Sequence, residues 1–239
     1  MTTPVALTIA GSDSGGGAGI QADLKTFAAF GVYGLSVITA VTAQNTVGVR
    51  AVQEIDPAVI TAQLDAVAED FSIGALKTGM LSSAAIIGAV VDGITRHELQ
   101  PPVVDPVMVA KSGDRLLRQD AVDALRRKLL PRRIMEFGAR AVVIKGGHSG
   151  EDPVVDLLVD QEGVHEYWAS RIATTSTHGT GCTFAAAIAA ALAKGMDLAG
   201  AVGQAREYLS RALAAAPGLG HGHGPMNHFP SVEAAHAGR

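Results

Sequence analysis

Residues 177–182 (THGTGC) combine residue types that can hold an anion beside a sulfur atom. They run directly into an alanine-rich apolar stretch, which predicts a buried helix that begins at these glycines. The first N–H groups of a helix lack partners within the helix, and the helix dipole favours a negative ligand there. The segment therefore predicts an anion cradle formed by Gly179, Thr180, Gly181 and Cys182. The same field is expected to lower the pKa of the Cys182 thiol.

A second glycine-rich loop, residues 11–19 (GSDSGGGAG), follows a strand-like run near the amino end. Taken alone, either glycine segment could be an ordinary cap or turn, but two of them favour close approach of the backbone to a ligand. The loop does not fit a dinucleotide fingerprint, because Ile20 stands where the third glycine should be. Leu76 precedes Lys77-Thr78 where a Walker A motif requires glycine, so that motif is absent.

Composition favours a single α/β domain, residues 1–239, that acts on small molecules. The chain has 48% hydrophobic and 18% charged residues and a net charge of −4, without a long basic run. These values do not indicate the basic surface that binding to nucleic acid or to an anionic membrane requires. One cysteine excludes an internal disulfide, and the first residues lack the pattern of a signal peptide, so we expect a cytoplasmic protein.

Strand-like and helix-like patterns alternate along most of the chain, which is typical of βαβ units around a mostly parallel sheet. We expect a three-layer α/β/α fold with helices on both faces of the sheet. The predicted strands are 5–10, 35–43, 73–76, 103–104 and 141–144, the predicted helices are 20–30, 58–68, 83–97, 181–194 and 198–216, and residues 154–172 form an added hairpin.

Two charged residues follow predicted strands at the carboxyl edge of the sheet, where ligands bind in open α/β folds. Asp105 follows strand 103–104, and Lys145 follows strand 141–144. A lysine at this edge can meet phosphate oxygens as a point charge. Asp105 could instead be a turn residue before Pro106. Both residues are predicted to lie at an ATP or phosphate site.

The ordered set of motifs resembles the hydroxymethylpyrimidine and phosphomethylpyrimidine kinases of thiamine biosynthesis, a branch of the ribokinase-like superfamily. The resemblance covers nearly the whole chain. It rests on residues 9–23 (IAGSDSGGGAGIQAD), 42–46 (TAQNT), 77–81 (KTGML), 105–108 (DPVM), 110–113 (AKSG), 145–148 (KGGH), 178–182 (HGTGC) and 222–225 (GHGP).

The resemblance implies transfer of a phosphoryl group from ATP, with magnesium, to the hydroxymethyl oxygen of 4-amino-5-hydroxymethyl-2-methylpyrimidine. The monophosphate is then phosphorylated again. Gln44 would hold the ring, since a carboxamide offers a donor and an acceptor side by side. The remaining pocket residues implied by the family are Asp23, Gly11, Met80 and Val107. A homodimer is also implied.

For the chemistry, the family places the anion hole at the amides of Gly179, Thr180, Gly181 and Cys182. Cys182 stands where most ribokinase relatives carry an aspartate base. Lys145 and magnesium would balance the charge of the phosphates, and Asp105 is a possible metal ligand. This arrangement requires Gln44 and Cys182 to open onto one common cavity.

The chain departs from the family pattern between Pro131 and Arg132. Family members carry a further core strand here, with a downstream glutamate that helps to organise magnesium. In this chain Pro131 passes directly into the helix-like residues 132–138. Either the intervening segment belongs to the protein and is absent from this sequence, or the deletion is real; a Cα–Cα distance near 3.8 Å across the junction would show a genuine bond.

Two alternative functions remain open. A pyridoxal or pyridoxine kinase would act on a related ring that also bears a hydroxymethyl group. A non-catalytic ligand-binding relative would retain the pocket but lack the strand that organises the metal. Gln44 and the single cysteine favour the pyrimidine kinase.

Overall fold

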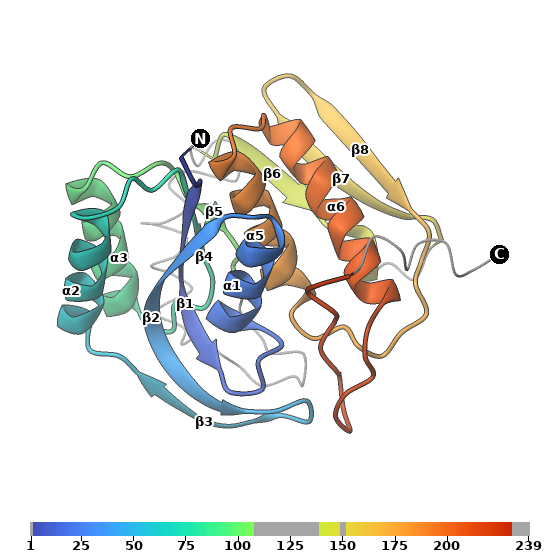
Figure 1. The fold of residues 1–239 in the computed structure, drawn as a ribbon, viewed down its shortest axis with the longest axis horizontal. Helices are drawn as coiled ribbons and strands as arrows, with labels where there is room; N and C mark the ends of the chain where they lie inside the picture. The colour runs from blue at the N-terminus through green and yellow to red at the C-terminus, as the bar shows by residue number, and fades with distance from the viewer. Residues whose placement is uncertain (1, 108–138, 149–151, 231–239) are drawn as a thin grey trace.

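The computed structural model describes residues 2–107, 139–148 and 152–230 (Figure 1). The strands are β1 (Val5–Asp13), β2 (Tyr33–Gln44), β3 (Val49–Glu54), β4 (Ala75–Thr78), β5 (Val103–Val104), β6 (Ala141–Ile144), β7 (Val154–Asp160) and β8 (Val164–Ala169). The helices are α1 (Gly19–Ala29), α2 (Pro57–Ala68), α3 (Ala84–Arg96), α5 (Thr180–Ala193) and α6 (Leu198–Ala214), with a short 3-10 helix, Gly146–His148.

The described strands form two sheets. Five strands lie in the order β3-β2-β1-β4-β5, in which β2, β1, β4 and β5 are parallel and β3 is antiparallel to β2. The second sheet, β6-β7-β8, is antiparallel. The parallel sheet and the β7–β8 hairpin confirm the sequence predictions, but the hairpin joins β6 in a sheet of its own. Strand β3 was not predicted.

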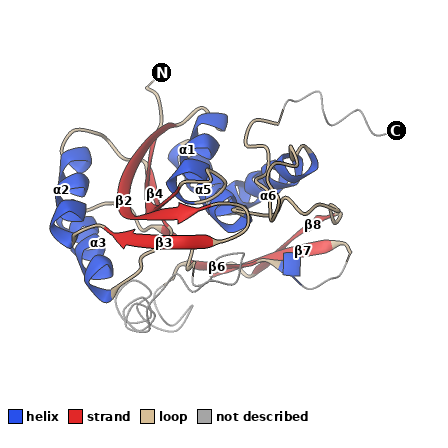
Figure 2. Cartoon of the chain, turned by 90° about the horizontal axis from the view of Figure 1, so that it is seen from below, coloured by secondary structure: helices blue, strands red, loops and turns tan. Residues whose placement is uncertain are grey.

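Helices cover both faces of the five-stranded sheet, as predicted for an α/β fold (Figures 1 and 2). Alternation along β1 explains this, because Leu7 and Ile9 pack in the cluster that includes α2 and α3, whereas Ala6 packs in the cluster with α1 and α5. Small alanines on the second face let α5 lie close to the strands. Asp56 caps α2 by accepting a hydrogen bond from the Ala58 N–H at 2.8 Å.

Helix α5 lies between the two sheets and packs on both. It contacts β1, β4 and β5 of the first sheet. Its residues Ala187 and Ile188 share a hydrophobic cluster with Leu158 of β7 and with Leu209 of α6. The alanine-rich stretch that the sequence marked as a buried helix is therefore the central helix of the fold, and its amino end carries residues 179–182.

Strands β5 and β6 pack on the same cluster without pairing with each other. Val103 of β5 and Ala141 and Val143 of β6 contact the cluster around α5 and α6. Among the described strands, β5 pairs with β4 alone and β6 with β7 alone. The strand that the family pattern places after Pro131 falls between them in chain order. The Pro131–Arg132 junction itself lies outside the described residues.

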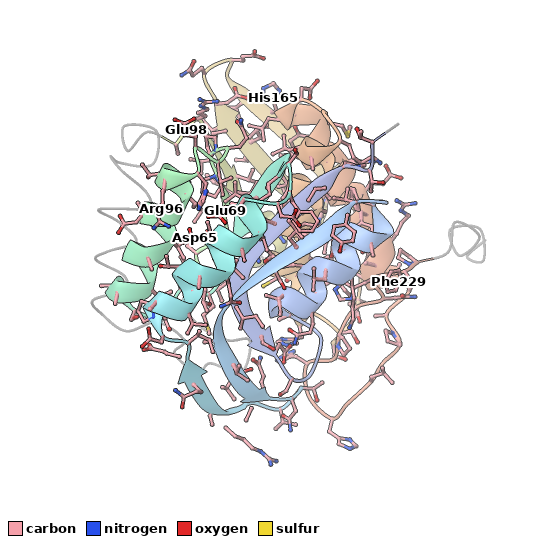
Figure 3. The ribbon with its side chains drawn as sticks, turned by 60° about the vertical axis from the view of Figure 1, so that its left-hand side comes forward. Asp65, Glu69, Arg96, Glu98, His165 and Phe229 are labelled. Carbon is pink, nitrogen blue, oxygen red and sulfur yellow. The ribbon has the colours of Figure 1, made fainter. Side chains whose placement is uncertain are left out.

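The outer surface of the α2–α3 layer is tied together by ion pairs. Asp65 of α2 accepts hydrogen bonds from Arg96 at the end of α3 and, at 2.7 Å, from the adjacent His97 (Figure 3). The bond from His97, with the nearby positive charge, holds the pKa of Asp65 below its usual value. Within the described residues, no helix is long and apolar enough to cross a membrane.

Candidate active site

The two glycine-rich segments of the sequence pack directly against each other. Gly179 adopts a φ of +78°, and a Cβ at this position would overlap the carbonyl oxygen of Gly17. A Cβ at Gly17 would in turn lie 2.6 Å from the ring of His178. Only residues without a side chain allow this approach, so the loop at the end of β1 and the turn before α5 form one surface.

The carboxylate of Asp13 joins these two segments. It accepts hydrogen bonds from the N–H groups of Gly15 (2.8 Å), Gly17 (3.1 Å) and Ala18 (2.9 Å), and it lies 2.9 Å from Nε2 of His178. Burial alone would raise the pKa of Asp13, but the bonds from His178 and the backbone lower it below its usual value. Asp13 is therefore an ionised, buried anchor.

Sequence reasoning assigned no role to Asp13 or His178. A signal for Asp13 was present, since an aspartate followed by glycines is typical of a turn in which the side chain binds the backbone. His178 had no comparable signal, because its partner lies 165 residues away in the chain.

Cys182 lies in the first turn of α5 and is nearly inaccessible, with 8% of its surface exposed. Burial raises the pKa of its thiol to about 12, and the nearby carboxylates of Asp105 and Asp23 act in the same direction. Lys77 and a hydrogen bond from the Gly19 backbone only partly oppose this effect. The predicted lowering of the thiol pKa is therefore wrong: desolvation outweighs the helix field, and the sulfur carries its proton at neutral pH.

Lys145 and Asp105 reach the cradle from two different strands, as their sequence positions predicted. Lys145 donates a hydrogen bond to the carbonyl of Thr180 at 3.3 Å and lies 4.6 Å from the ring centre of Phe184. The oxygens of Asp105 lie 3.4 and 3.5 Å from where a Cβ on Gly181 would be. Burial lowers the pKa of Lys145 to about 8, although Asp156 and Asp105 oppose the shift.

One oxygen of Asp105 has an unusual environment. Its Oδ2 is buried and has no hydrogen-bond partner among the described residues. Magnesium in phosphate-transfer sites is commonly held by one or two carboxylates together with substrate phosphates. Asp105 fits that requirement, although the described residues contain no cluster of three or more potential metal ligands.

The predicted ring-binding residue, Gln44, lies at the end of β2 next to the cradle. Its amide nitrogen lies 3.4 Å from Nε2 of His178, the residue that precedes Gly179. Gly11 and Met80 also lie together, because a Cβ on Gly11 would lie 2.7 Å from Cε of Met80. Through His178, the structure brings the carboxamide and the amide cradle to one place.

Val107 sits just beyond β5, where its N–H donates to the Asp105 carbonyl at 2.8 Å. It is half-buried. The family motif at residues 110–113 lies outside the described residues.

Asp23, which the resemblance assigns to the substrate pocket, is paired with a lysine in the core. Its carboxylate is fully buried and accepts hydrogen bonds from Lys77 at 2.9 Å and from Thr8 at 2.6 Å. Burial would lower the pKa of Lys77, but Asp23 beside it raises that pKa above its ordinary value. Asp23 is therefore part of a buried ion pair with Lys77, and its contact with a substrate stays a prediction.

A cavity of about 330 Å³ opens beside the cradle. Polar groups from the cradle line one part of it, and aliphatic side chains from β7 and α6 line another, which is the usual composition of a small-molecule pocket. Its lining includes Lys145, Thr180, Gly181, Asp156, Arg206, Val154, Ile172, Leu209 and Leu213. The cavity therefore lies beside the phosphate cradle and continues from it.

This combination of fold and site defines a class of protein. A parallel sheet covered on both faces, with a helix amino end and a lysine around an anion cradle, is that of a ribokinase-like small-molecule kinase. The phosphomethylpyrimidine kinase family model matches residues 13–134 and 132–227. The chain belongs to this family, which confirms the resemblance.

Similar proteins agree with this assignment. The hydroxymethylpyrimidine/phosphomethylpyrimidine kinase of Rhizobium meliloti is 49% identical over 260 residues, covering 95% of this chain and 97% of the relative. The Escherichia coli protein of the same name is 45% identical over 94% of this chain and 97% of its own length. These relatives are phosphotransferases.

Solved structures show the same fold. An ADP complex of Bacillus subtilis pyridoxal kinase has a TM-score of 0.87 and 35% identity, covering 96% of this chain and 98% of that one. The phosphomethylpyrimidine kinase of Clostridium difficile has a TM-score of 0.76 and 39% identity, covering 87% of this chain and 99% of the other.

The comparisons also bear on the Pro131–Arg132 junction. The family match is split into two stretches that meet at residues 132–134. The alignment to the Rhizobium meliloti relative spans 260 positions, whereas this chain has 239 residues. Both observations support a segment that the relatives contain and this sequence lacks.

We predict that Gly179→Ala destabilises the protein more than Gly31→Ala does. Both glycines have positive φ values, +78° and +69°, which cost an alanine about 1–2 kcal/mol. A Cβ at Gly31 meets no atom within 4 Å, whereas at Gly179 it overlaps Gly17. Urea unfolding measures the difference, and equal losses would show that the two segments do not depend on their close approach.

We predict that Lys77→Met lowers the free energy of unfolding by about 3–5 kcal/mol, because it leaves the buried Asp23 carboxylate without its counter-charge. The double variant with Asp23→Asn should lose less than the sum of the single changes. Arg96→Met, at the exposed ion pair, is the matched control and should lose less than about 1 kcal/mol. Equal losses for Lys77→Met and Arg96→Met would contradict the structural role of the Lys77–Asp23 pair.

Proposed function

We propose that this protein transfers the γ-phosphoryl group of ATP to the hydroxymethyl oxygen of 4-amino-5-hydroxymethyl-2-methylpyrimidine, and then phosphorylates the monophosphate to the diphosphate. This would make it a kinase of thiamine biosynthesis. Family membership supports the proposal. The observation that carries it is the contact between the side-chain amide of Gln44 and Nε2 of His178, 3.4 Å apart, because His178 directly precedes the amide cradle.

The ATP phosphates would lie in the cradle, and the rest of the nucleotide would lie in the cavity beside it. The ADP complex of Bacillus subtilis pyridoxal kinase supports binding of a nucleotide in this fold. The amides of Gly179, Thr180, Gly181 and Cys182 would donate to the oxygens of the migrating group. Phosphoryl transfer depends mainly on positioning and on balancing negative charge, and these amides do both.

Three side chains would complete the charge balance and the positioning. Lys145 faces the cradle as a cation and would attract the phosphates. Asp105, with its unpartnered oxygen, would hold Mg²⁺ together with the nucleotide. Bound magnesium would neutralise phosphate charge. Cys182, protonated and neutral, would act by contact with the acceptor or phosphoryl oxygen and not as a general base.

A second candidate function is phosphorylation of pyridoxal or pyridoxine. The fit to pyridoxal kinases of Bacillus subtilis and Staphylococcus aureus, each with a TM-score of 0.87, favours it. Higher sequence identity to the pyrimidine kinases supports the first candidate. A non-catalytic relative is a third possibility if the deletion at Pro131–Arg132 is real.

One set of assays tests these candidates. Purified protein with MgATP is given the pyrimidine alcohol, its monophosphate or pyridoxine, and ADP release is measured as kcat/KM. We expect turnover of both pyrimidines and a lower value for pyridoxine. A clear preference for pyridoxine would overturn the substrate assignment. Absence of turnover, together with retained binding of the pyrimidine, would identify a non-catalytic relative.

We also propose a homodimer located in the cytoplasm, as the family resemblance implies. Light scattering of the purified protein tests the assembly, and fractionation of the source cells tests the location. A monomeric mass would contradict the first proposal, and recovery outside the cytoplasmic fraction would contradict the second.

We predict that Cys182→Ala lowers kcat, because it removes the S–H that would contact the acceptor or phosphoryl oxygen but leaves the backbone N–H of residue 182 in the cradle. The cost of about 2.7–4 kcal/mol for a lost anion-hole donor in other enzymes is the upper bound for this effect. Cys182→Ser should retain more activity, because a hydroxyl can also donate a hydrogen bond. Binding of the pyrimidine, measured by calorimetry, controls for collapse of the pocket. A nearly normal kcat in Cys182→Ala would remove the sulfur from the mechanism.

We predict that kcat/KM for ATP falls as pH rises through about 8. The pKa of Lys145 is lowered to about 8 by burial, so this lysine loses its charge above that pH instead of near 10.5. Lys145→Arg keeps its charge throughout this range and should remove the alkaline decline. A decline that persists unchanged in Lys145→Arg would assign it to another group.

A further inference from the structure

The amide of Gln44 can lie in two orientations that exchange its oxygen and its nitrogen, and its neighbours decide which one is stable. One end of the amide lies 3.4 Å from Nε2 of His178. The other end lies 3.2 Å from Oγ1 of Thr42. The hydrogen positions on these two neighbours therefore determine which group each end of the amide must present.

At the first end, His178 must be a donor. Its Nε2 lies 2.9 Å from Oδ2 of Asp13, whose lowered pKa keeps it ionised and therefore able only to accept. The hydrogen is thus on Nε2 of His178. With its nitrogen at this end, Gln44 would place its NH₂ group against the N–H of His178, so that two donors face each other. We therefore exchange the two amide atoms, so that the oxygen of Gln44 faces His178.

At the second end, Thr42 must accept. Its hydroxyl has one hydrogen, and the carbonyl oxygen of Ser12, at 3.0 Å, can only accept. With that hydrogen given to Ser12, Oγ1 of Thr42 has a lone pair for the NH₂ group of Gln44. Both ends therefore select the same orientation, in which no donor faces another donor.

We propose that His178, fixed by Asp13, and Thr42 determine substrate specificity by locking the polarity of the Gln44 amide. This inference rests on the proposed function and deepens it. In this orientation the amide offers the substrate one donor, its second N–H, and one acceptor, the free lone pair of its oxygen, and the two cannot exchange places. That order suits a ring with an exocyclic amino group beside a ring nitrogen, because the amine donates to the oxygen and the ring nitrogen accepts from the N–H.

The vitamin B6 ring lacks an amino group next to its ring nitrogen, so it cannot satisfy both positions. A site built to hydrogen-bond a substrate group discriminates strongly against analogues that lack the group, since its own polar atoms then remain unpaired. His178 acts here as a positioning residue through Gln44. It also precedes the cradle directly, so ring recognition and the phosphate site share one anchor.

The test compares kcat/KM for the aminopyrimidine alcohol, its 4-deamino analogue and pyridoxine in wild type, His178→Phe and Thr42→Val. Wild type should prefer the amino compound to its deamino analogue. We expect each variant to lower this preference at least tenfold, mainly through KM for the amino compound. Because His178 also precedes the cradle, the value for pyridoxine serves as the reference for any general loss, and the value for the amino compound should fall further than this reference.

A double-mutant cycle separates positioning from a general structural role. If His178 acts through Gln44, adding His178→Phe to Gln44→Ala should change the amino/deamino preference no further. A loss that falls equally on all three substrates, or one that persists in the Gln44→Ala background, would overturn the proposal. Thr42→Val tests the opposite end of the amide if His178→Phe does not fold.

Calorimetric binding of the amino and deamino pyrimidines, without nucleotide, tests the orientation independently of turnover. Failure of the proposed function would appear as absence of phosphorylation in wild type with amino-selective binding intact. Failure of this inference would appear as selective binding in wild type that His178→Phe and Thr42→Val leave unchanged.

Discussion

The site depends on one buried carboxylate. Asp13 gathers three backbone N–H groups of the first glycine loop and the imidazole of His178, which belongs to the turn before α5. A buried carboxylate is stable only when its charge is met by several donors, and here those donors come from opposite ends of the chain. The close glycine contacts remove the steric obstacle, and the charge supplies the attraction. This anchor fixes the position of the Gln44 carboxamide relative to the amides at the start of α5.

Much of the fold could be predicted because it follows local rules. Hydrophobic runs predicted the parallel strands, and the predicted helix 58–68 agrees with α2 to within one residue. Asp105 and Lys145 each follow the carboxyl end of a predicted strand, but they reach the cradle from two different sheets, which the sequence pattern did not predict. Strand β3 was missed because its residues are mostly exposed and show no buried face. Its conformation comes from pairing with β2, which is a property of the tertiary structure.

The site residues were harder to predict where burial decided their behaviour. For Cys182, the helix end was visible in the sequence, but the burial of the sulfur was not, so the predicted direction of the pKa shift was wrong. Asp23 was assigned to substrate by resemblance, whereas the structure pairs it with Lys77, a residue 54 positions away. The roles of Asp13 and His178 require a contact between distant segments. A sequence shows charged residues, hydrogen-bond donors and turn glycines, but it does not show which side chains from distant segments contact each other.

Helix α5 has a mechanical consequence for such a site. It packs on β1, β4 and β5 of the first sheet, and it shares a hydrophobic cluster with β7 and α6, which contribute residues to the cavity. The amides of residues 180–182 at its tip are therefore positioned by the same packing that forms one wall of the cavity. Enlarging one of its buried alanines, such as Ala187 or Ala190, would displace the amino end of the helix as well as the core.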